Sequence, residues 1–417
     1  PPFAPGTAEL HITVNGLQLS PFWVPFVFYH NNCTINSLSI DSGPVNGSTR
    51  THALGRGFVD TDILCLFTMP SDNGTTTSTS VGTFVDGQDL VCVSPVADAT
   101  GVATVTLSLN GGQDICTGKR GLFLYYYFPE VQLLLPNNIP VVETYSNAST
   151  QLDLVGSGLN RTGGDLWSRF GADNATECTV VSDSSAVCSA PPSQEGGVVN
   201  VSLSLNSYDW SLASSVFTYV PLVDSYSPEL GPNRGGTNIS VLGHGFVDDD
   251  ARGRSSCVFQ SGRAVAAHVA HSQMLFCTSP VALQDGLQAI SIGVAVGGQH
   301  YGYSSSDTFY QHAEPLILRL SAASAPVTGR VFLTVFMQSI ELPPGTPVYV
   351  QLSPATGDRL VFAQPPKHVL GGVWSGDDAV VELPDFSSPQ FFQEWSSWLP
   401  GDLEVFVSFN GVDWRSN

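Results

Sequence analysis

The chain has 417 residues, a formal net charge of −21 and only 12% charged residues, with 41 glycines and 28 prolines. Only two lysines occur, Lys119 and Lys367, so the charge excludes nucleic acid and an anionic membrane surface as partners. A chain of this length divides into several domains. Abundant Val, Thr, Phe and Tyr, punctuated by glycine and proline, predict that these domains are all-β.

The first predicted element is a hairpin in residues 9–29, whose second half reads SPFWVPFVFY. Alternation of apolar and polar residues followed by an aromatic run is the pattern with which each later repeat ends. Residues 1–30 are therefore interpreted as the C-terminal hairpin of a preceding domain.

Three short glycine motifs then recur along the chain, GRGF at 55–58, GSGL at 156–159 and GHGF at 243–246. Each is followed by a cysteine and a nearby proline, by a predicted hairpin, and by an aromatic strand that contains Tyr127, Tyr219 or Tyr310. The spacing of these tyrosines is the size of one seven-stranded sandwich.

This pattern predicts three complete domains, at 31–128, 129–220 and 221–313, and a divergent fourth at 314–417 that lacks its last strand. The segments between domains are short and contain proline, as in FPEV and VPLV, and no Gly/Ser tract separates them. We expect a stiff or gently bent rod.

The glycine motif does not predict a nucleotide-binding loop. In the third copy the position of the third glycine is Asp248, and the acidic run that it begins would repel a pyrophosphate. The two glycines are expected instead to let the second strand of the domain bulge and turn, where φ is positive or another backbone comes close.

The stretch SYSPELGPNRGGTNISVLGHGF, with the later CVF, FCTSP, ISIGVAVGG and FY, resembles the IPT/TIG immunoglobulin-like family. This family is known from plexins, hepatocyte-growth-factor-receptor-type ectodomains and many algal and protist surface proteins. The resemblance covers the whole chain, is strongest in 221–313, and is weakest after 314, where the glycine motif and all cysteines are lost. It implies tandem Ig-like β-sandwiches and no single function.

Repeat position predicts three disulfides within domains, Cys65–Cys92, Cys178–Cys188 and Cys257–Cys277. Cys33 precedes the first strand of its domain, and Cys116 lies in the loop of the last hairpin, which returns to the entry pole of a sandwich. These two are expected to pair, and free thiols or an intermolecular link are the alternative.

Eight N-x-S/T triplets predict an extracellular or cell-surface glycoprotein, because such sites are modified in the secretory pathway. The acceptor residues are Asn32, Asn46, Asn73, Asn147, Asn160, Asn174, Asn200 and Asn238. Membrane attachment is expected only through segments outside this piece, since no run of about 18 apolar residues occurs.

Other candidate chemistry is weak. Asp60 and Asp62, and the run 248–250, are acidic clusters without the spacing of a calcium loop, so solvated loops are favoured over Ca²⁺ sites. His268 and His271 form no ligand set. No nucleophile elbow appears, and the prediction is a protein without enzymatic activity, metal or cofactor.

Two aromatic clusters exceed ordinary core needs and are candidate contacts for another chain or a glycan, although core packing is the alternative. Their members are Phe22, Trp23, Phe391, Phe392, Trp395 and Trp398. The favoured function is a structural or adhesion protein that contacts other proteins, and can self-associate into a filament. Flagellar-hair (mastigoneme) subunits and gamete adhesins of green algae resemble this organisation. The alternative is a carbohydrate-binding or enzyme-accessory module.

Overall fold

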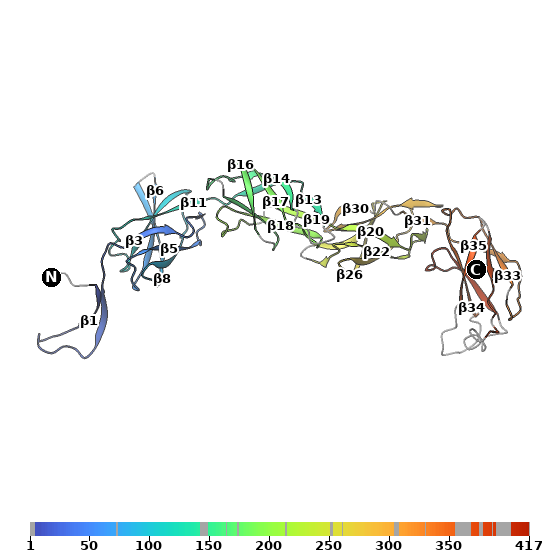
Figure 1. Cartoon of the computed structure of the whole chain (residues 1–417), viewed down its shortest axis with the longest axis horizontal. Helices are drawn as coiled ribbons and strands as arrows, with labels where there is room; N and C mark the ends of the chain where they lie inside the picture. The colour runs from blue at the N-terminus through green and yellow to red at the C-terminus, as the bar shows by residue number, and fades with distance from the viewer. Residues whose placement is uncertain are drawn as a thin grey trace. The chain divides into compact units, whose positions relative to one another are not determined.

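The computed structural model describes residues 5–71, 74–141, 149–163, 165–172, 175–212, 215–250, 253–260, 262–303, 308–329, 331–354, 368–374, 378–385, 387–388 and 402–416 (Figure 1). Every regular element in these ranges is a β-strand. None of these residues belongs to a helix with the length and hydrophobicity of a membrane span. Two compact units are present, Pro1–Asn137 with Asn147–Pro191 and Val199–Phe217, and Asn138–Ser146 with Pro192–Val198 and Thr218–Asn417.

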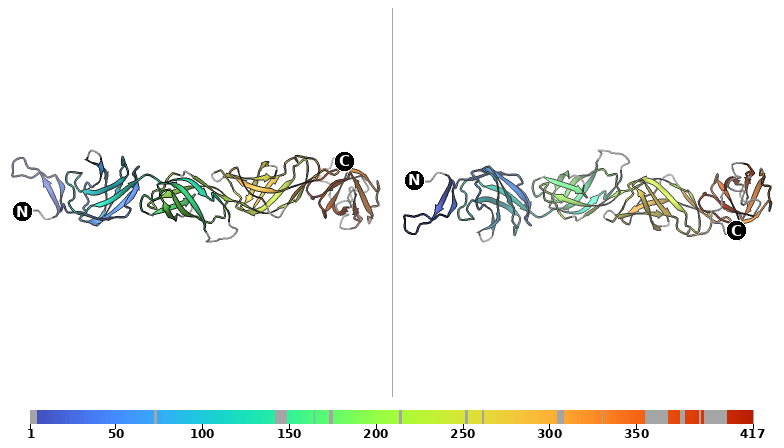
Figure 2. Two further views of the ribbon diagram at one scale, coloured as in Figure 1. Left: turned by 90° about the horizontal axis from the view of Figure 1, so that it is seen from above. Right: turned by 90° about the horizontal axis from the view of Figure 1, so that it is seen from below.

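The chain begins with a two-stranded antiparallel sheet of β1 (Gly6–His11) and β2 (Trp23–Phe28). Gly6 pairs with Phe28 and His11 with Trp23, so the register is regular along the whole ribbon. Figure 2 shows this hairpin projecting from the sandwich that follows it. Most side chains of both strands are exposed, because a two-stranded ribbon has no second layer to cover either face.

The first repeat (31–128) is a sandwich of two sheets. One sheet has the order β3 (Thr34–Leu38), β5 (Arg50–Arg56), β9 (Asp89–Val93), β8 (Thr83–Asp86). The other has the order β4 (Ser42–Pro44), β11 (Gly121–Tyr126), β10 (Gly101–Ser108), β6 (Leu64–Ser71), β7 (Gly74–Val81). Alternate residues of both sheets meet in one core, in which the rings of Phe67 and Phe123 make an edge-to-face contact with 5.5 Å between centroids.

The second repeat (129–220) has its strands joined into one continuous path of eight. The order is β12 (Glu130–Leu135), β14 (Thr150–Ser157), β17 (Ser185–Ala190), β16 (Thr176–Ser182), β15 (Leu166–Phe170), β18 (Gly197–Ser204), β19 (Ser215–Val220), β13 (Asn138–Pro140). The two layers are linked by β16, which pairs with β15 through its first residues and with β17 through its last. The rings of Phe170 and Phe217 meet edge to face in the core.

The third repeat (221–313) contains three sheets. The first has the order β20 (Leu222–Ser227), β22 (Asn238–His244), β27 (Met274–Thr278), β26 (His268–His271). The second has the order β21 (Leu230–Pro232), β31 (Phe309–His312), β28 (Gln288–Ile290). The third has the order β23 (Asp248–Asp249), β24 (Gly253–Phe259), β29 (Ile292–Val296), β30 (Gln299–Tyr303), and β25 (Ala264–Ala266) also pairs with β24. All three sheets contribute to one core, which contains Ile239, Phe259, Val294 and Phe309.

The fourth repeat (314–417) forms one six-stranded path. The order is β32 (Ile317–Leu320), β33 (Phe332–Met337), β36 (Asp378–Glu382), β35 (His368–Trp374), β34 (Val348–Pro354), β37 (Leu403–Ser408). Its core contains Val335, Val350, Val381 and Val407. The predicted fold class, all-β with tandem Ig-like sandwiches, is confirmed.

In the first three repeats a short strand that ends in proline runs parallel to the closing strand. Pro44, Pro140 and Pro232 pair with Tyr126, Val220 and His312, respectively. This register makes Tyr125, Tyr219 and Gln311 the equivalent positions. The sequence alignment that placed Tyr127 and Tyr310 opposite Tyr219 is therefore wrong. Tyr127 lies two residues after the equivalent position, and Tyr310 lies one residue before it.

The recurrent glycine pair has two structural roles. A Cβ on Gly55, Gly156 or Gly243 would lie 1.9, 2.1 or 2.0 Å from a carbonyl oxygen of the repeat's first strand. The second glycine of each pair has positive φ, as in Gly57 with φ of 82°. Close approach and positive φ are thus confirmed, but the irregular register lies in the first strand, as between Ile35 and Ser37, rather than in the second as expected.

Candidate functional site

Four disulfides join Cys33 to Cys116, Cys65 to Cys92, Cys178 to Cys188, and Cys257 to Cys277, with Cα–Cα distances of 5.3, 6.0, 4.3 and 6.3 Å. The second and fourth connect the two layers of their sandwich, because their cysteines lie on β6 and β9, and on β24 and β27. The third links the neighbouring strands β16 and β17, and the first ties the β10–β11 loop to the segment before β3. Disulfides of this density are typical of proteins from oxidising compartments.

Five predicted glycosylation sites lie in the described residues, and the side chain of each is exposed. They are Asn32, Asn46, Asn160, Asn200 and Asn238. Asn200 lies within β18 and faces solvent. Asn73, Asn147 and Asn174 lie outside the described residues.

The main polar feature is a contact between consecutive repeats, which we call the first clasp (Ser42, Thr49, Asn206 and Asp209). The loop after β18 presents Asn206 and Asp209 to the preceding repeat. The Asn206 Nδ2 donates to the Ser42 carbonyl oxygen at 2.8 Å, and the Thr49 hydroxyl donates to the Asp209 carboxylate at 2.7 Å. Asn206 also donates to Asp209, and its Oδ1 accepts from the Asp209 N–H, both at 2.8 Å, so the two residues of the loop also hold each other.

The second clasp (Leu230, Thr237, Asn410 and Asp413) repeats this arrangement between the third and fourth repeats. The Asn410 Nδ2 donates to the Leu230 carbonyl oxygen at 2.7 Å, and the Thr237 hydroxyl donates to the Asp413 carboxylate at 2.7 Å. The internal bonds from Asn410 to Asp413 and back are also present. Two joints of the chain are therefore held by the same four-group contact.

The receiving side of each clasp is built around a glycine. A Cβ on Gly43 would lie 2.1 Å from the Thr49 Oγ1, and a Cβ on Gly231 would lie 2.4 Å from the Thr237 Oγ1. Both threonines are fully buried. Only glycine leaves room for a threonine that faces the next repeat, and a buried hydroxyl needs the carboxylate that it finds there.

The second joint also contains a cluster of charges. Glu314 forms ion pairs with Arg234 of the third repeat and with Arg415 of the fourth. The imidazole of His312 is buried beside them, and its Nδ1 donates to the Ala313 carbonyl oxygen at 2.7 Å. Burial, opposed by that hydrogen bond and by nearby carboxylates, lowers the pKa of His312 from its ordinary value of 6.5.

Neither clasp was predicted from the sequence. A signal was present, because the loops read NSYDW at 206–210 and NGVDW at 410–414. Asn110 and Asp114 form the same internal hydrogen bonds in the first repeat, at 2.9 Å in both directions. Within the described part of the chain, no side-chain hydrogen bond joins this loop to another repeat, so its internal hydrogen bonds form without docking.

Of the predicted aromatic contacts, Phe22 and Trp23 lie on the β1–β2 hairpin, with 84% and 51% of their surfaces exposed. Leu10, Val24 and Phe26 on the same hairpin are also exposed. Phe391, Phe392, Trp395 and Trp398 lie outside the described residues. The hairpin therefore presents an apolar surface that its own two strands cannot bury.

The acidic and histidine clusters make no cation site in the described part of the chain, where no group of three His, Cys, Asp or Glu side chains converges. Asp250 instead accepts a hydrogen bond from the Arg254 Nε at 2.8 Å. His268 and His271 both face solvent on β26.

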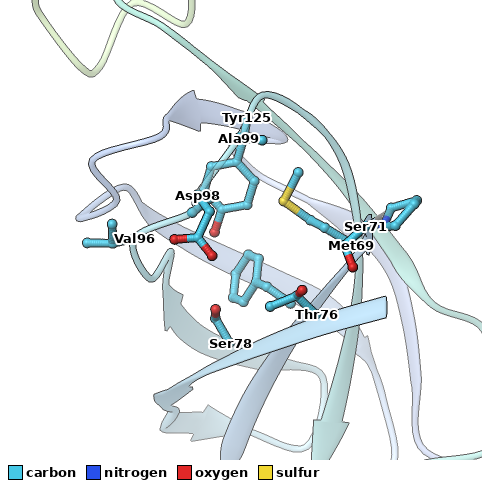
Figure 3. Close-up of a pocket in the computed structure, with 11 residues that line it drawn as sticks. Met69, Ser71, Thr76, Ser78, Val96, Asp98, Ala99 and Tyr125 are labelled. Atoms are coloured by element: carbon cyan, nitrogen blue, oxygen red, sulfur yellow. The ribbon is translucent and has the colours of Figure 1, made fainter. Parts of the chain in front are cut away.

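A small hollow of about 110 Å³ opens at one edge of the first repeat (Figure 3). The Tyr125 hydroxyl donates to the Pro95 carbonyl oxygen at 3.0 Å, and burial raises the pKa of this phenol, which stays protonated. Asp98 is the single ionisable carboxylate beside it. Among the residues that line the hollow, no nucleophile is paired with a base, so we interpret it as a partly open edge of the hydrophobic core.

The fourth repeat has a larger apolar groove, of about 550 Å³, between residues 322–327 and the start of β37. Gly329 N–H donates to the Pro326 carbonyl oxygen, as Gly47 does to Pro44 and Gly235 to Pro232. Residues 324–326 thus correspond to β4 and β21. The groove lies at the place that the closing strand fills in the first and third repeats.

Comparison with known proteins identifies the modules. The IPT/TIG domain family matches residues 138–219 and 221–311. Fibrocystin-L of Mus musculus is 25% identical over 309 residues, which are 72% of this chain and 7% of that protein. Plexin-2 of Caenorhabditis elegans is 26% identical over 186 residues, 44% of this chain and 10% of that protein.

Among solved structures, the extracellular region of plexin A4 aligns with 92% of this chain and 30% of its own, at 17% identity and a TM-score of 0.30. The Escherichia coli adhesin FdeC aligns with 67% of this chain and 96% of its own, at 13% identity and a TM-score of 0.21. This chain spans a tenth or less of the two curated relatives. The chain therefore carries IPT/TIG domains in two tandem copies, at residues 138–219 and 221–311.

Proposed function

We propose that this protein is an extracellular, glycosylated structural or adhesion protein whose Ig-like sandwiches contact other protein chains, in a surface filament or between cells. The observation that carries the proposal is the pair of clasps. Each holds two consecutive sandwiches together through a buried threonine, a carboxylate and an amide. A protein that spaces or links surfaces needs such fixed joints, whereas an enzyme needs a convergent reactive site.

Two further features support the proposal. Five sequon asparagines face solvent, where a glycan can be attached without unfolding. The hairpin β1–β2 exposes Phe22, Trp23 and Phe26, and exposed aromatic residues are typical anchors of protein interfaces. Self-association through this apolar surface is the form of contact that we favour.

The test uses beads coated with the whole chain, together with sedimentation velocity of the free protein. We expect concentration-dependent clustering and sedimentation, both reduced by Phe22→Ser combined with Trp23→Ser. The matched control is Leu212→Ser, which removes an apolar side chain that is 90% exposed in the second repeat. Strictly monomeric sedimentation at high concentration, with no clustering of beads, would argue against self-association.

Carbohydrate binding is the second candidate, because adjacent exposed rings at Phe22 and Trp23 can stack on the apolar faces of sugars. A glycan array separates the two functions. Binding to one polysaccharide that is lost in Trp23→Ala, from a protein that does not self-associate, would favour the carbohydrate-binding module. An array without signal, together with clustering beads, favours the protein contact.

A further inference from the structure

We propose that the second joint, between residues 221–313 and 314–417, is an acid-sensitive switch. Protonation of His312 releases the second clasp, whereas the first clasp, which has Tyr126 in the same place, stays closed. The joint would thus become mobile in a mildly acidic compartment while the rest of the chain keeps its geometry.

The position of His312 couples its charge to docking. It ends β31, pairs with Pro232, and has only 4% of its surface exposed. Its ring meets that of Phe409 edge to face, with 5.3 Å between centroids and 83° between planes. Phe409 belongs to the fourth repeat and directly precedes Asn410 of the second clasp. The imidazole is therefore covered by the repeat that the clasp holds in place.

Four charged groups face this imidazole from the elements around it: Arg234, Glu314, Asp413 and Arg415 line the same small cavity. Both carboxylates favour an imidazolium, but both are already engaged. Asp413 accepts from Thr237 and Asn410, and Glu314 pairs with both arginines. The guanidinium groups of Arg234 and Arg415 add positive charge nearby, which opposes a further cation.

The direction of the effect follows from linkage. Desolvation is the largest influence on His312 and lowers its pKa in the docked state below 6.5. An undocked, solvated imidazole titrates near 6.5. Docking is therefore at full strength above about pH 6.5 and weakens as the pH falls toward the docked-state pKa. Each pH unit between the two values weakens the docking equilibrium by up to about tenfold.

The first joint provides an internal control. Tyr126 pairs with Pro44 as His312 pairs with Pro232, and it is equally buried. Burial and the nearby Asp209 carboxylate raise the pKa of the Tyr126 phenol, so this side chain stays neutral throughout mildly acidic and neutral pH. The two clasps share their hydrogen bonds and differ in the titratable ring beside them.

The experiment measures distances across both joints in the whole chain at pH 7.5 and pH 5.0. Non-cysteine dye pairs are placed at exposed sites, Ala266 and Glu404 for the second joint and Leu122 and Glu177 for the first. We expect the distance distribution of the 266/404 pair to broaden reversibly at pH 5.0, with a several-fold rise in the undocked fraction. The 122/177 pair should not change.

Two variants decide the cause. His312→Tyr copies the first joint and should abolish the response, and His312→Gln serves if the tyrosine does not fit. Tyr126→His should create an acid response in the first joint. An unchanged 266/404 distribution at pH 5.0 would overturn the proposal. So would a response that persists in both His312 variants, because the carboxylates of Glu314 or Asp413 would then be the groups that titrate.

Discussion

Removal of the Asp209 carboxylate is expected to open the joint between the first and second repeats. In Asp209→Ala the Thr49 hydroxyl loses its acceptor at 2.7 Å, and the Asn206 amide loses a partner at 2.8 Å. A hydrogen bond to a charged group contributes about 1.5–3 kcal/mol, and a buried hydroxyl left without a partner costs a similar amount. Asp209 is half-buried, so solvent screens part of this, and we expect a loss of about 2 kcal/mol. That is roughly a 30-fold weaker docking equilibrium.

The assay is the distance distribution of the 122/177 dye pair, read in the whole chain with low concentrations of urea. The matched control is Asp114→Ala, which removes the equivalent carboxylate from the loop of the first repeat, where it accepts from Asn110. Thr49→Val alone and combined with Asp209→Ala completes a double-mutant cycle. Additive effects of the two substitutions, or equal effects of Asp209→Ala and Asp114→Ala, would refute the clasp.

Four other results are expected. Gly243→Ala should destabilise the third repeat by about 2 kcal/mol, because its Cβ would lie 2.0 Å from the Leu222 carbonyl oxygen, whereas Gly371→Ala, which has open space, should melt like the parent in calorimetry. Non-reducing peptide mapping should recover the four disulfides, and an alkylated Cys33 would contradict them. Hydrogen exchange should be faster in β1–β2 than in β10–β11, and equal protection would place the hairpin within a sandwich. Mass spectrometry of secreted protein should find glycans on most of the five exposed sequons, and their complete absence would remove the extracellular assignment.

The fold class could be predicted because its signals are local. Alternation with period two, glycine pairs and cysteine–proline steps each report on the backbone of one strand or turn. Gly55 and Gly243 are examples, since a glycine is required wherever a Cβ would meet a carbonyl oxygen. The same local patterns, repeated along the chain, marked the sandwiches.

Register and joints could not be predicted in the same way. Tyr125, Tyr126 and Tyr127 are consecutive, so alternation does not say which of them faces the core, and pairing with β4 decides it. The bulge that we expected in the second strand of each repeat lies in the first strand. The position of a bulge depends on how two strands pair, and the sequence of one strand alone does not show this. The clasps are contacts between repeats, and a loop sequence such as NSYDW does not reveal what its amide and carboxylate bind.

The joint between the second and third repeats lacks the clasp and differs from the two clasped joints on both sides. On the donor side, Leu107 pairs with Cys65 in the first repeat and Val294 pairs with Cys257 in the third. Three residues further along, Gly297 therefore stands in the third repeat where Asn110 stands in the first. On the receiving side, Ile139 stands before Pro140, where the clasped repeats have a glycine. The threonine is kept, because the register with the cysteine strand makes Thr150 the equivalent of Thr49 and Thr237, but Thr150 is exposed. The donor asparagine and the glycine of the receiving side are replaced.

Backbone contact takes their place at this joint. The Gly196 N–H donates to the Gly245 carbonyl oxygen at 3.1 Å, and a Cβ on Gly245 would lie 2.8 Å from a methyl carbon of Val141. The second glycine of the GHGF motif therefore serves its own turn and also admits the neighbouring repeat. The receiving threonine is thus buried at the two joints where it meets a carboxylate, and its equivalent Thr150 is exposed at the joint that is built from glycine and apolar contacts. This is the distribution expected if a buried hydroxyl needs a hydrogen-bond partner.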